Sequence, residues 1–173
     1  MRRKHNGVSF VWADLLCKQF QLIKDTFKSG LELQHPDEHR SFIVETDASD
    51  FGIGGVLSQE EQDGLLRSIV FFSRQMLPAE RNYEVYDKEL LAVFVCFKHW
   101  RHFLQGSRHP VTVLTDHLNL QYFMTERQLT RRQARWSLFF NEFDFVLTHR
   151  AGHLNGKADR LSRRIDYKVR GCD

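Results

Sequence analysis

The sequence has few cysteines and no long hydrophobic run. Cys17, Cys96 and Cys172 form no CxxC pair, and the first two fall within apolar helical patterns. This spacing argues against a disulfide framework and favours a reducing, intracellular compartment. The first ten residues, MRRKHNGVSF, lack the apolar core of a secretory signal, and no stretch of about 18 apolar residues occurs. We therefore expect a soluble protein that does not interact with membranes.

Internal repeats and low-complexity segments are also absent. The 173 residues fit one ordinary domain plus a short extension, and an apolar fraction of 42% is enough to form a core. The polar stretch 34–40 is the one plausible boundary, so we divide the chain into 1–40, 41–164 and a tail over 165–173. The net charge is only +3, but arginines cluster within 127–135 and 160–164. Such local clusters indicate an anionic partner.

The hydrophobic periodicity predicts five strands and several helices. A meander of three strands comes first, and helices and strands then alternate, which is typical of an α/β protein with helices packed on a mixed sheet. A helical extension precedes the sheet. The expected elements are a helix over 12–29, strands over 42–46, 53–58 and 68–73, a long helix from Pro78 to the stop at Gly106, a strand over 111–115, a basic helix over 129–140, a strand over 143–148 and a last helix over 155–163.

Four acids stand at element ends or beside apolar faces. Asp47 ends the first strand, Asp116 ends the fourth, Glu89 lies beside the core stripe of the long helix, and Asp159 lies in the last helix. A crossover that places strand four beside strand one makes Asp47 and Asp116 neighbours. Two carboxylates held so close repel each other unless a cation neutralises them. Oxygen ligands favour Mg²⁺ or Mn²⁺, and two such ions can promote phosphodiester hydrolysis.

Each acid also has an ordinary structural interpretation. Asp47 starts an Asp-Ala-Ser-Asp run that is typical of a turn, and Glu89 can be a surface acid of its helix. Asp116 can cap a short helix that begins near Asn119, and Asp159 can be a solvated residue. Taken singly, these residues leave both interpretations open.

Longer segments carry a family resemblance. ETDASDFGIGGVLSQ, the helix segment with KELLAVFVCFKHW, VTVLTDHLNLQYFM and LTRRQARWSLFFNEFDFVLTHRAGHLNGKADRLSR occur in this order from about Phe42 to Arg164. Together they resemble the ribonuclease H domain of reverse transcriptases from LTR retrotransposons of the Ty3/gypsy type. The resemblance implies a ribonuclease H-like fold. It also implies a site of two Mg²⁺ or Mn²⁺ ions held by Asp47, Glu89, Asp116 and Asp159.

The resemblance implies roles for further residues. Many ribonucleases H carry a histidine before the last acid that helps product or metal leave, and His149 and His153 are the candidates here. HRAG stands where relatives have YRPG, so His149 replaces an aromatic residue. The basic helix, with Trp136 and Phe140 toward the core, presents arginines that either contact nucleic acid or form a solvated face. The expected nucleic-acid contacts are Arg131, Arg132, Arg135, Ser49, Asn82 and Tyr83.

The implied activity is cleavage of the RNA strand of an RNA:DNA hybrid, leaving a 3′-hydroxyl and a 5′-phosphate. Residues 1–40 resemble the segment that joins the polymerase part of such enzymes to ribonuclease H, so a polymerase domain is the expected partner. The paired aspartates of a polymerase are missing, and we expect no copying activity. The expected compartment is a cytoplasmic particle or the nucleus. One alternative is a catalytically silent nucleic-acid-binding remnant. An aspartic protease is disfavoured, because TDAS has the wrong residue order and no second copy.

Overall fold

A computed structural model of the protein describes residues 17–22, 33–125, 128–152 and 155–167. The chain divides into two compact units, 1–32 and 33–173. In the first unit residues 17–22 are helical, and the rest of the helix predicted over 12–29 lies outside the described residues. None of the helices described is long and apolar enough to cross a membrane.

The second unit is built on the mixed sheet that the sequence predicts. The strands β1 (Phe42–Ala48), β2 (Gly52–Glu60) and β3 (Leu66–Gln75) form an antiparallel meander. The strands β4 (Val111–Thr115) and β5 (Phe145–His149) run parallel to β1. The spatial order is β3-β2-β1-β4-β5. The crossover from β3 to β4 therefore places the fourth strand beside the first, as expected.

The prediction of one long helix from Pro78 to Gly106 is wrong, because the segment forms three helices. They are α2 (Pro78–Arg81), α3 (Val85–His99) and α4 (Arg101–Leu104). The Glu80 carboxylate accepts the Leu77 N–H at 2.8 Å and pairs with Arg74 at 2.8 Å, which caps the start of α2 and ties it to β3. Glu84 then has an extended backbone, with φ −62° and ψ 156°. The second break, at Trp100, separates α3 from α4.

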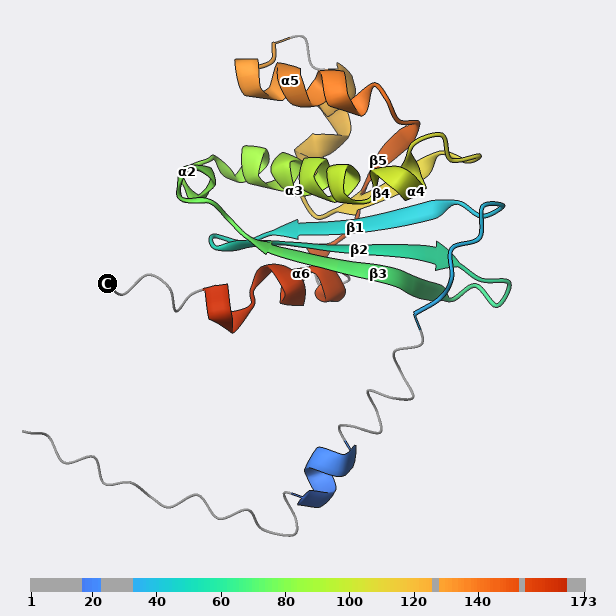
Figure 1. Cartoon of the computed structure of the whole chain (residues 1–173). Helices are drawn as coiled ribbons and strands as arrows, with labels where there is room; N and C mark the ends of the chain where they lie inside the picture. The colour runs from blue at the N-terminus through green and yellow to red at the C-terminus, as the bar shows by residue number, and fades with distance from the viewer. Residues whose placement is uncertain (1–16, 23–32, 126–127, 153–154, 168–173) are drawn as a thin grey trace, which may run out of the picture. The chain divides into compact units, whose positions relative to one another are not determined.

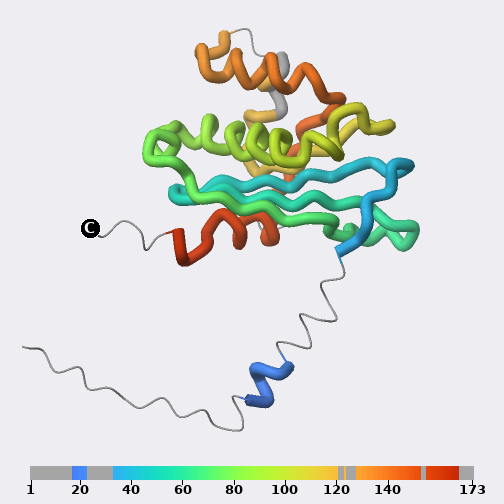
Figure 2. The backbone as a smooth tube through the Cα atoms, viewed as in Figure 1, coloured from blue at the N-terminus to red at the C-terminus, as the bar shows by residue number. Residues whose placement is uncertain are grey.

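The remaining helices lie on both sides of the sheet (Figures 1 and 2). After β4 come the 3₁₀ helix η1 (Leu118–Thr125) and α5 (Arg131–Phe140); α6 (Gly156–Ser162) and the 3₁₀ helix η3 (Ile165–Tyr167) follow β5. The helix α3 covers one face of the sheet and α6 the other, while α5 packs over α3. Thr130 caps α5 by accepting the Gln133 N–H. Phe97, Phe140 and Phe143 form the aromatic centre of the core between α3, α5 and the sheet.

Candidate metal centre

The parallel pairing of β1 and β4 brings two aspartates to one edge of the sheet. The parallel register pairs Glu45 with Leu114, and Asp47 and Asp116 each stand two residues further along the sequence. Asp47 is the penultimate residue of β1, which continues two residues beyond the predicted strand end at Thr46. Asp116 directly follows β4, as the sequence predicts.

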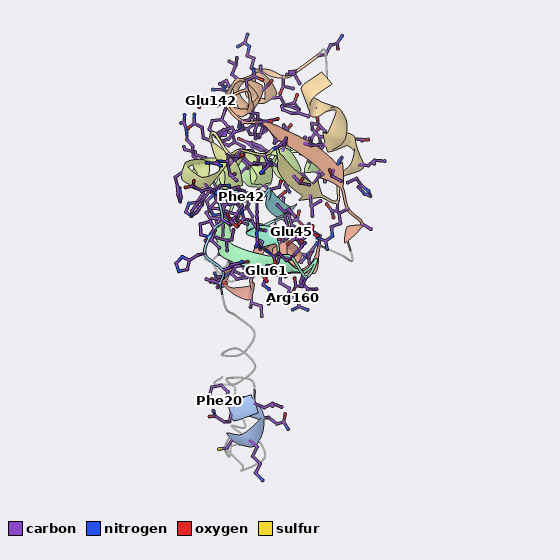
Figure 3. The ribbon with its side chains drawn as sticks, turned by 90° about the vertical axis from the view of Figure 1, so that its right-hand side faces the viewer. Phe20, Phe42, Glu45, Glu61, Glu142 and Arg160 are labelled. Carbon is purple, nitrogen blue, oxygen red and sulfur yellow. The ribbon has the colours of Figure 1, made fainter. Side chains whose placement is uncertain are left out.

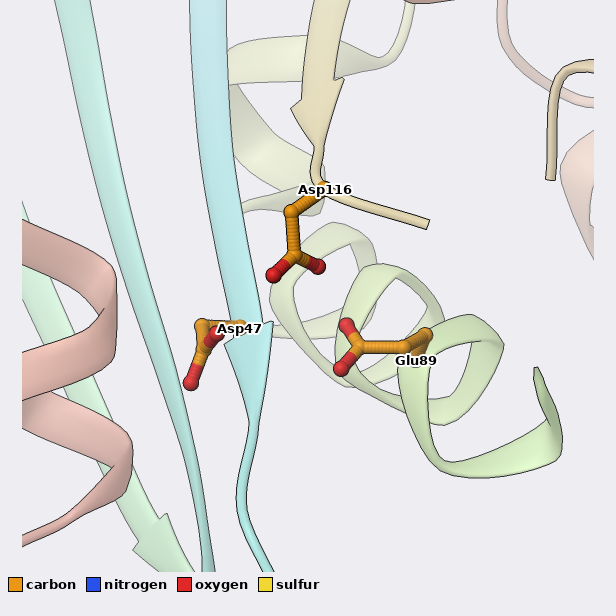
Figure 4. Close-up of side chains that lie close together, drawn as sticks. All are labelled: Asp47, Glu89 and Asp116. Atoms are coloured by element: carbon orange, nitrogen blue, oxygen red, sulfur yellow. The ribbon is translucent and has the colours of Figure 1, made fainter. Parts of the chain in front are cut away.

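Glu89 reaches this edge from α3. One carboxylate oxygen each from Asp47, Glu89 and Asp116 lies within 4.8 Å of the others, and this is the only such group of possible metal ligands among the described residues. Figure 4 shows the three side chains converging from β1, α3 and the end of β4. Asp47 and Glu89 are buried, whereas Asp116 is exposed. The centre is therefore dry on one side and open to solvent at Asp116.

The electrostatics of the cluster favour a bound cation. Burial raises the pKa of Glu89 to about 9, and repulsion from Asp47 and Asp116 adds to that shift. Burial also raises the pKa of Asp47, although a hydrogen bond from Ser162 opposes the rise. The backbone N–H of Ala48 donates to Glu89, but Glu89 Oε2 is buried without a hydrogen-bond partner. A hard divalent cation fits this all-oxygen set, because it supplies the missing charge and an electron-pair acceptor for the orphaned oxygen.

The helix α6 holds Asp47 from the other face of the sheet. The Ser162 hydroxyl donates to Asp47 Oδ2. The helix approaches closely because β2 carries Gly54 beneath it: a Cβ there would lie 2.2 Å from the Ala158 carbonyl oxygen. Ser162 was not among the predicted site residues, because no sequence pattern shows that it faces Asp47.

Asp159 lies on α6 but outside the three-acid cluster. Its side chain is 40% exposed and forms an ion pair with Arg163 Nε. It is still near the centre, since its charge contributes to the raised pKa of Asp47. The structure thus brings three of the four predicted acids together and leaves the fourth beside them, held by an arginine.

Residues 150–152, which follow β5, contact β4, β1 and Asp116. The Arg150 N–H bonds to the Thr115 carbonyl oxygen at 2.8 Å, and its guanidinium pairs with the buried Glu45, which Figure 3 labels. Gly152 lies against Asp116: a Cβ there would be 3.2 Å from Asp116 Oδ2. These contacts were also not predicted. Of the two candidate histidines, His149 is the exposed last residue of β5, and His153 lies outside the described residues.

The predicted nucleic-acid contacts have different environments. Ser49 is buried in the β1–β2 turn and donates to the Ser162 carbonyl oxygen at 2.7 Å. Arg132 lies 3.5 Å over the Tyr83 ring and pairs with Asp87 at 2.8 Å. Three of the predicted residues are exposed: Asn82 in the turn before α3, and Arg131 and Arg135 on α5.

Comparison with known proteins places these features in context. Residues 37–143 match the family described as the RNase H-like domain found in reverse transcriptase. The Transposon Tf2-3 and Tf2-4 polyproteins of Schizosaccharomyces pombe (strain 972 / ATCC 24843) are each 38% identical over 161 residues. That alignment covers 92% of this chain and 12% of each polyprotein, so the chain spans about an eighth of the length of these relatives.

Solved structures share the fold. LC11-RNase H1 in complex with an RNA/DNA hybrid matches with a TM-score of 0.59 and 18% identity, over 75% of this chain and 99% of that one. The foamy viral protease-reverse transcriptase in complex with dsDNA matches with a TM-score of 0.57 and 13% identity, over 82% of this chain and 30% of that one. At these identities the likeness establishes the fold alone, which is RNase H-like.

Proposed function

Because the chain belongs to the family of RNase H-like domains found in reverse transcriptases of the Ty3/gypsy type, we propose that it hydrolyses the RNA strand of RNA:DNA hybrids. The observation that carries this proposal is the convergence of Asp47, Glu89 and Asp116 within 4.8 Å at the edge of the sheet. Three carboxylates from three separate elements, two of them buried, are costly to hold together without a cation. The arrangement is therefore accounted for by metal-dependent chemistry.

The proposed ligands are Asp47, Glu89 and Asp116, with Asp159 as a fourth acid from α6. The ions are Mg²⁺ or Mn²⁺, most simply two of them, because every donor is a carboxylate oxygen. When bound, a pair of such ions activates water and stabilises the leaving oxygen of a phosphodiester. The chain's own contribution is to hold its acids in place: the Ser162 hydroxyl fixes Asp47, and the Ala48 N–H fixes Glu89.

The proposed substrate surface includes exposed residues of α5 and of the turn before α3. Arg131 and Arg135 are exposed on α5 and are available for phosphates of the hybrid. Arg132 is already held by Asp87 and Tyr83, so we assign it to positioning α5 on α3 as well as to charge. Asn82 is exposed at the turn before α3 and is the other proposed backbone contact. The polymerase domain of the parent polyprotein is the proposed partner.

A cleavage assay on an end-labelled RNA:DNA hybrid tests this function. We expect the protein to cut the RNA strand of the hybrid in Mg²⁺ or Mn²⁺ and to spare single-stranded and duplex RNA. Asp116→Asn should lower the rate by at least about 100-fold, because it removes a proposed metal ligand. The matched control is Asp144→Asn: Asp144 is exposed and precedes β5 at the opposite end of the parallel strands, so this variant should cut at the wild-type rate.

The same assay, run beside a measurement of hybrid binding, separates the enzyme from a binding module. Measurable hybrid binding without cleavage, by a folded protein in either metal, would contradict the proposed activity and identify the catalytically silent remnant. Cleavage that persists in Asp116→Asn would place the active centre elsewhere. The new RNA ends should carry a 3′-hydroxyl and a 5′-phosphate, which ligation and dephosphorylation of the products can verify.

A further inference from the structure

The fourth acid of the proposed centre has a cationic partner at the C-terminal end of its own helix. Arg163 follows Asp159 by four residues, and its Nε donates to Asp159 Oδ1. The same two residues are also joined by a helical backbone hydrogen bond, which the Arg163 N–H donates to the Asp159 carbonyl oxygen at 3.0 Å. Residues four apart on a helix share one face, and an acid that precedes a base by four residues forms the favoured orientation of such a pair. The geometry of α6 therefore places the guanidinium on Asp159.

The charge of Arg163 also reaches the three-acid cluster. It lowers the pKa of both Asp47 and Glu89, although burial outweighs it at each. Acidic residues in turn raise the pKa of Arg163: Asp159 has the largest effect, and Asp47 and Asp50 have smaller ones. One cation thus interacts with acids on three elements of the proposed metal centre.

The pair is also easy to break. Arg163 is 60% exposed and Asp159 40% exposed, so water screens the attraction and the arginine side chain can turn outward. Ion pairs of this kind contribute little to stability. A divalent cation beside Asp47 would repel the guanidinium and attract the Asp159 carboxylate. The same acid therefore has two alternative cationic partners.

We propose that Arg163 is an internal counter-ion of the metal centre, which holds Asp159 in the metal-free protein and must release it before that acid binds a divalent cation. This inference rests on the proposed function, because it assumes that Asp159 is a metal ligand. Arg163 is a positioning residue in this account: it sets how much cation is needed to complete the centre.

Calorimetric titration of the full chain with Mn²⁺ tests the inference without relying on activity. We expect Arg163→Gln to bind Mn²⁺ about two- to fivefold more tightly than wild type, because the competing exposed ion pair is gone. Arg164→Gln is the matched control. Arg164 is the next residue and is similarly exposed, but its guanidinium bonds to Asp166 at 2.9 Å. This variant should bind Mn²⁺ like wild type.

A double-mutant cycle shows whether Arg163 acts through Asp159. In an Asp159→Asn background, adding Arg163→Gln should raise Mn²⁺ affinity by less than it does in wild type, because only the charge that reaches Asp47 and Glu89 is then removed. An equal gain with and without Asp159 would overturn the inference, because the effect would then be long-range charge alone. Unchanged or weaker binding by Arg163→Gln would also overturn it, while the metal centre itself would stand. If wild type bound no Mn²⁺, or bound it no better than Asp116→Asn does, both the metal centre and this inference would fail.

Discussion

At the scale of one residue, Glu89 shows that the proposed centre lowers the free energy of unfolding. Burial, then Asp47 and Asp116, raise its pKa from 4.5 to about 9. Below about pH 4.5 the group is protonated in both the folded and the unfolded chain. Between pH 4.5 and about 9 the unfolded chain loses this proton while the folded protein keeps it. The contribution of Glu89 to the free energy of unfolding therefore falls as the pH rises through this window.

Glu89→Gln should remove this pH dependence. Measured by urea unfolding in EDTA, the variant should gain stability relative to wild type between pH 5 and pH 8, by an amount of the order of a few kcal/mol. The control is Glu60→Gln, because Glu60 is exposed at the far end of β2 from Asp47. That variant should follow the wild-type profile. A constant difference between Glu89→Gln and wild type across this range would contradict the raised pKa.

At the scale of elements, local patterns predicted the strands well and the continuity of helices poorly. The strand over 111–115 is predicted to the residue, since alternation and turn residues bound it on both sides. The stripe from Tyr86 to Leu104 indicated one helix, but it carries no sign of the break at Trp100. The first break falls where the backbone of Glu84 is extended, and the short helix before it is tied to β3 by the Arg74–Glu80 pair, a contact between elements. Periodicity within one element contains no such information.

The close packing of α6 against β2 predicts how a substitution between these two elements changes stability. Gly54→Ala places a Cβ 2.2 Å from the Ala158 carbonyl oxygen and 2.6 Å from the Ser162 nitrogen, so α6 must move away. We expect a loss of about 1–3 kcal/mol in the free energy of unfolding, as for other overpacked sites. Gly156→Ala is the control on α6 itself, because a Cβ there meets nothing within 4 Å. This change should shift stability by less than about 1 kcal/mol, in the favourable direction.

Thermal or urea unfolding of the Gly54→Ala and Gly156→Ala variants tests this prediction. If Gly54→Ala were as stable as Gly156→Ala, the close approach of α6 to the sheet would be wrong. The contact between Ser162 and Asp47 would then lose its structural basis.

At the scale of the whole molecule, the centre is a product of topology. Asp47 and Asp116 are far apart in the sequence, and only the crossover that pairs β1 with β4 brings them to one edge. The sequence placed both acids at predicted strand ends, and their proximity followed on the condition that the crossover lays the fourth strand beside the first. The sequence also indicated Glu89 through its place beside Leu90. What it did not indicate are the contacts that these acids receive from later parts of the chain: the Ser162 hydroxyl on Asp47, and Gly152 beside Asp116.

The dependence of hybrid cleavage on Mg²⁺ tests the central claim most directly. The initial rate should be zero in EDTA and should rise to saturation with Mg²⁺ for the wild-type protein. Asp47→Asn should be slower by at least about 100-fold at every Mg²⁺ concentration, since it removes a proposed metal ligand. Cleavage of the hybrid in EDTA, or an Asp47→Asn variant with the wild-type rate and the wild-type Mg²⁺ dependence, would contradict the account.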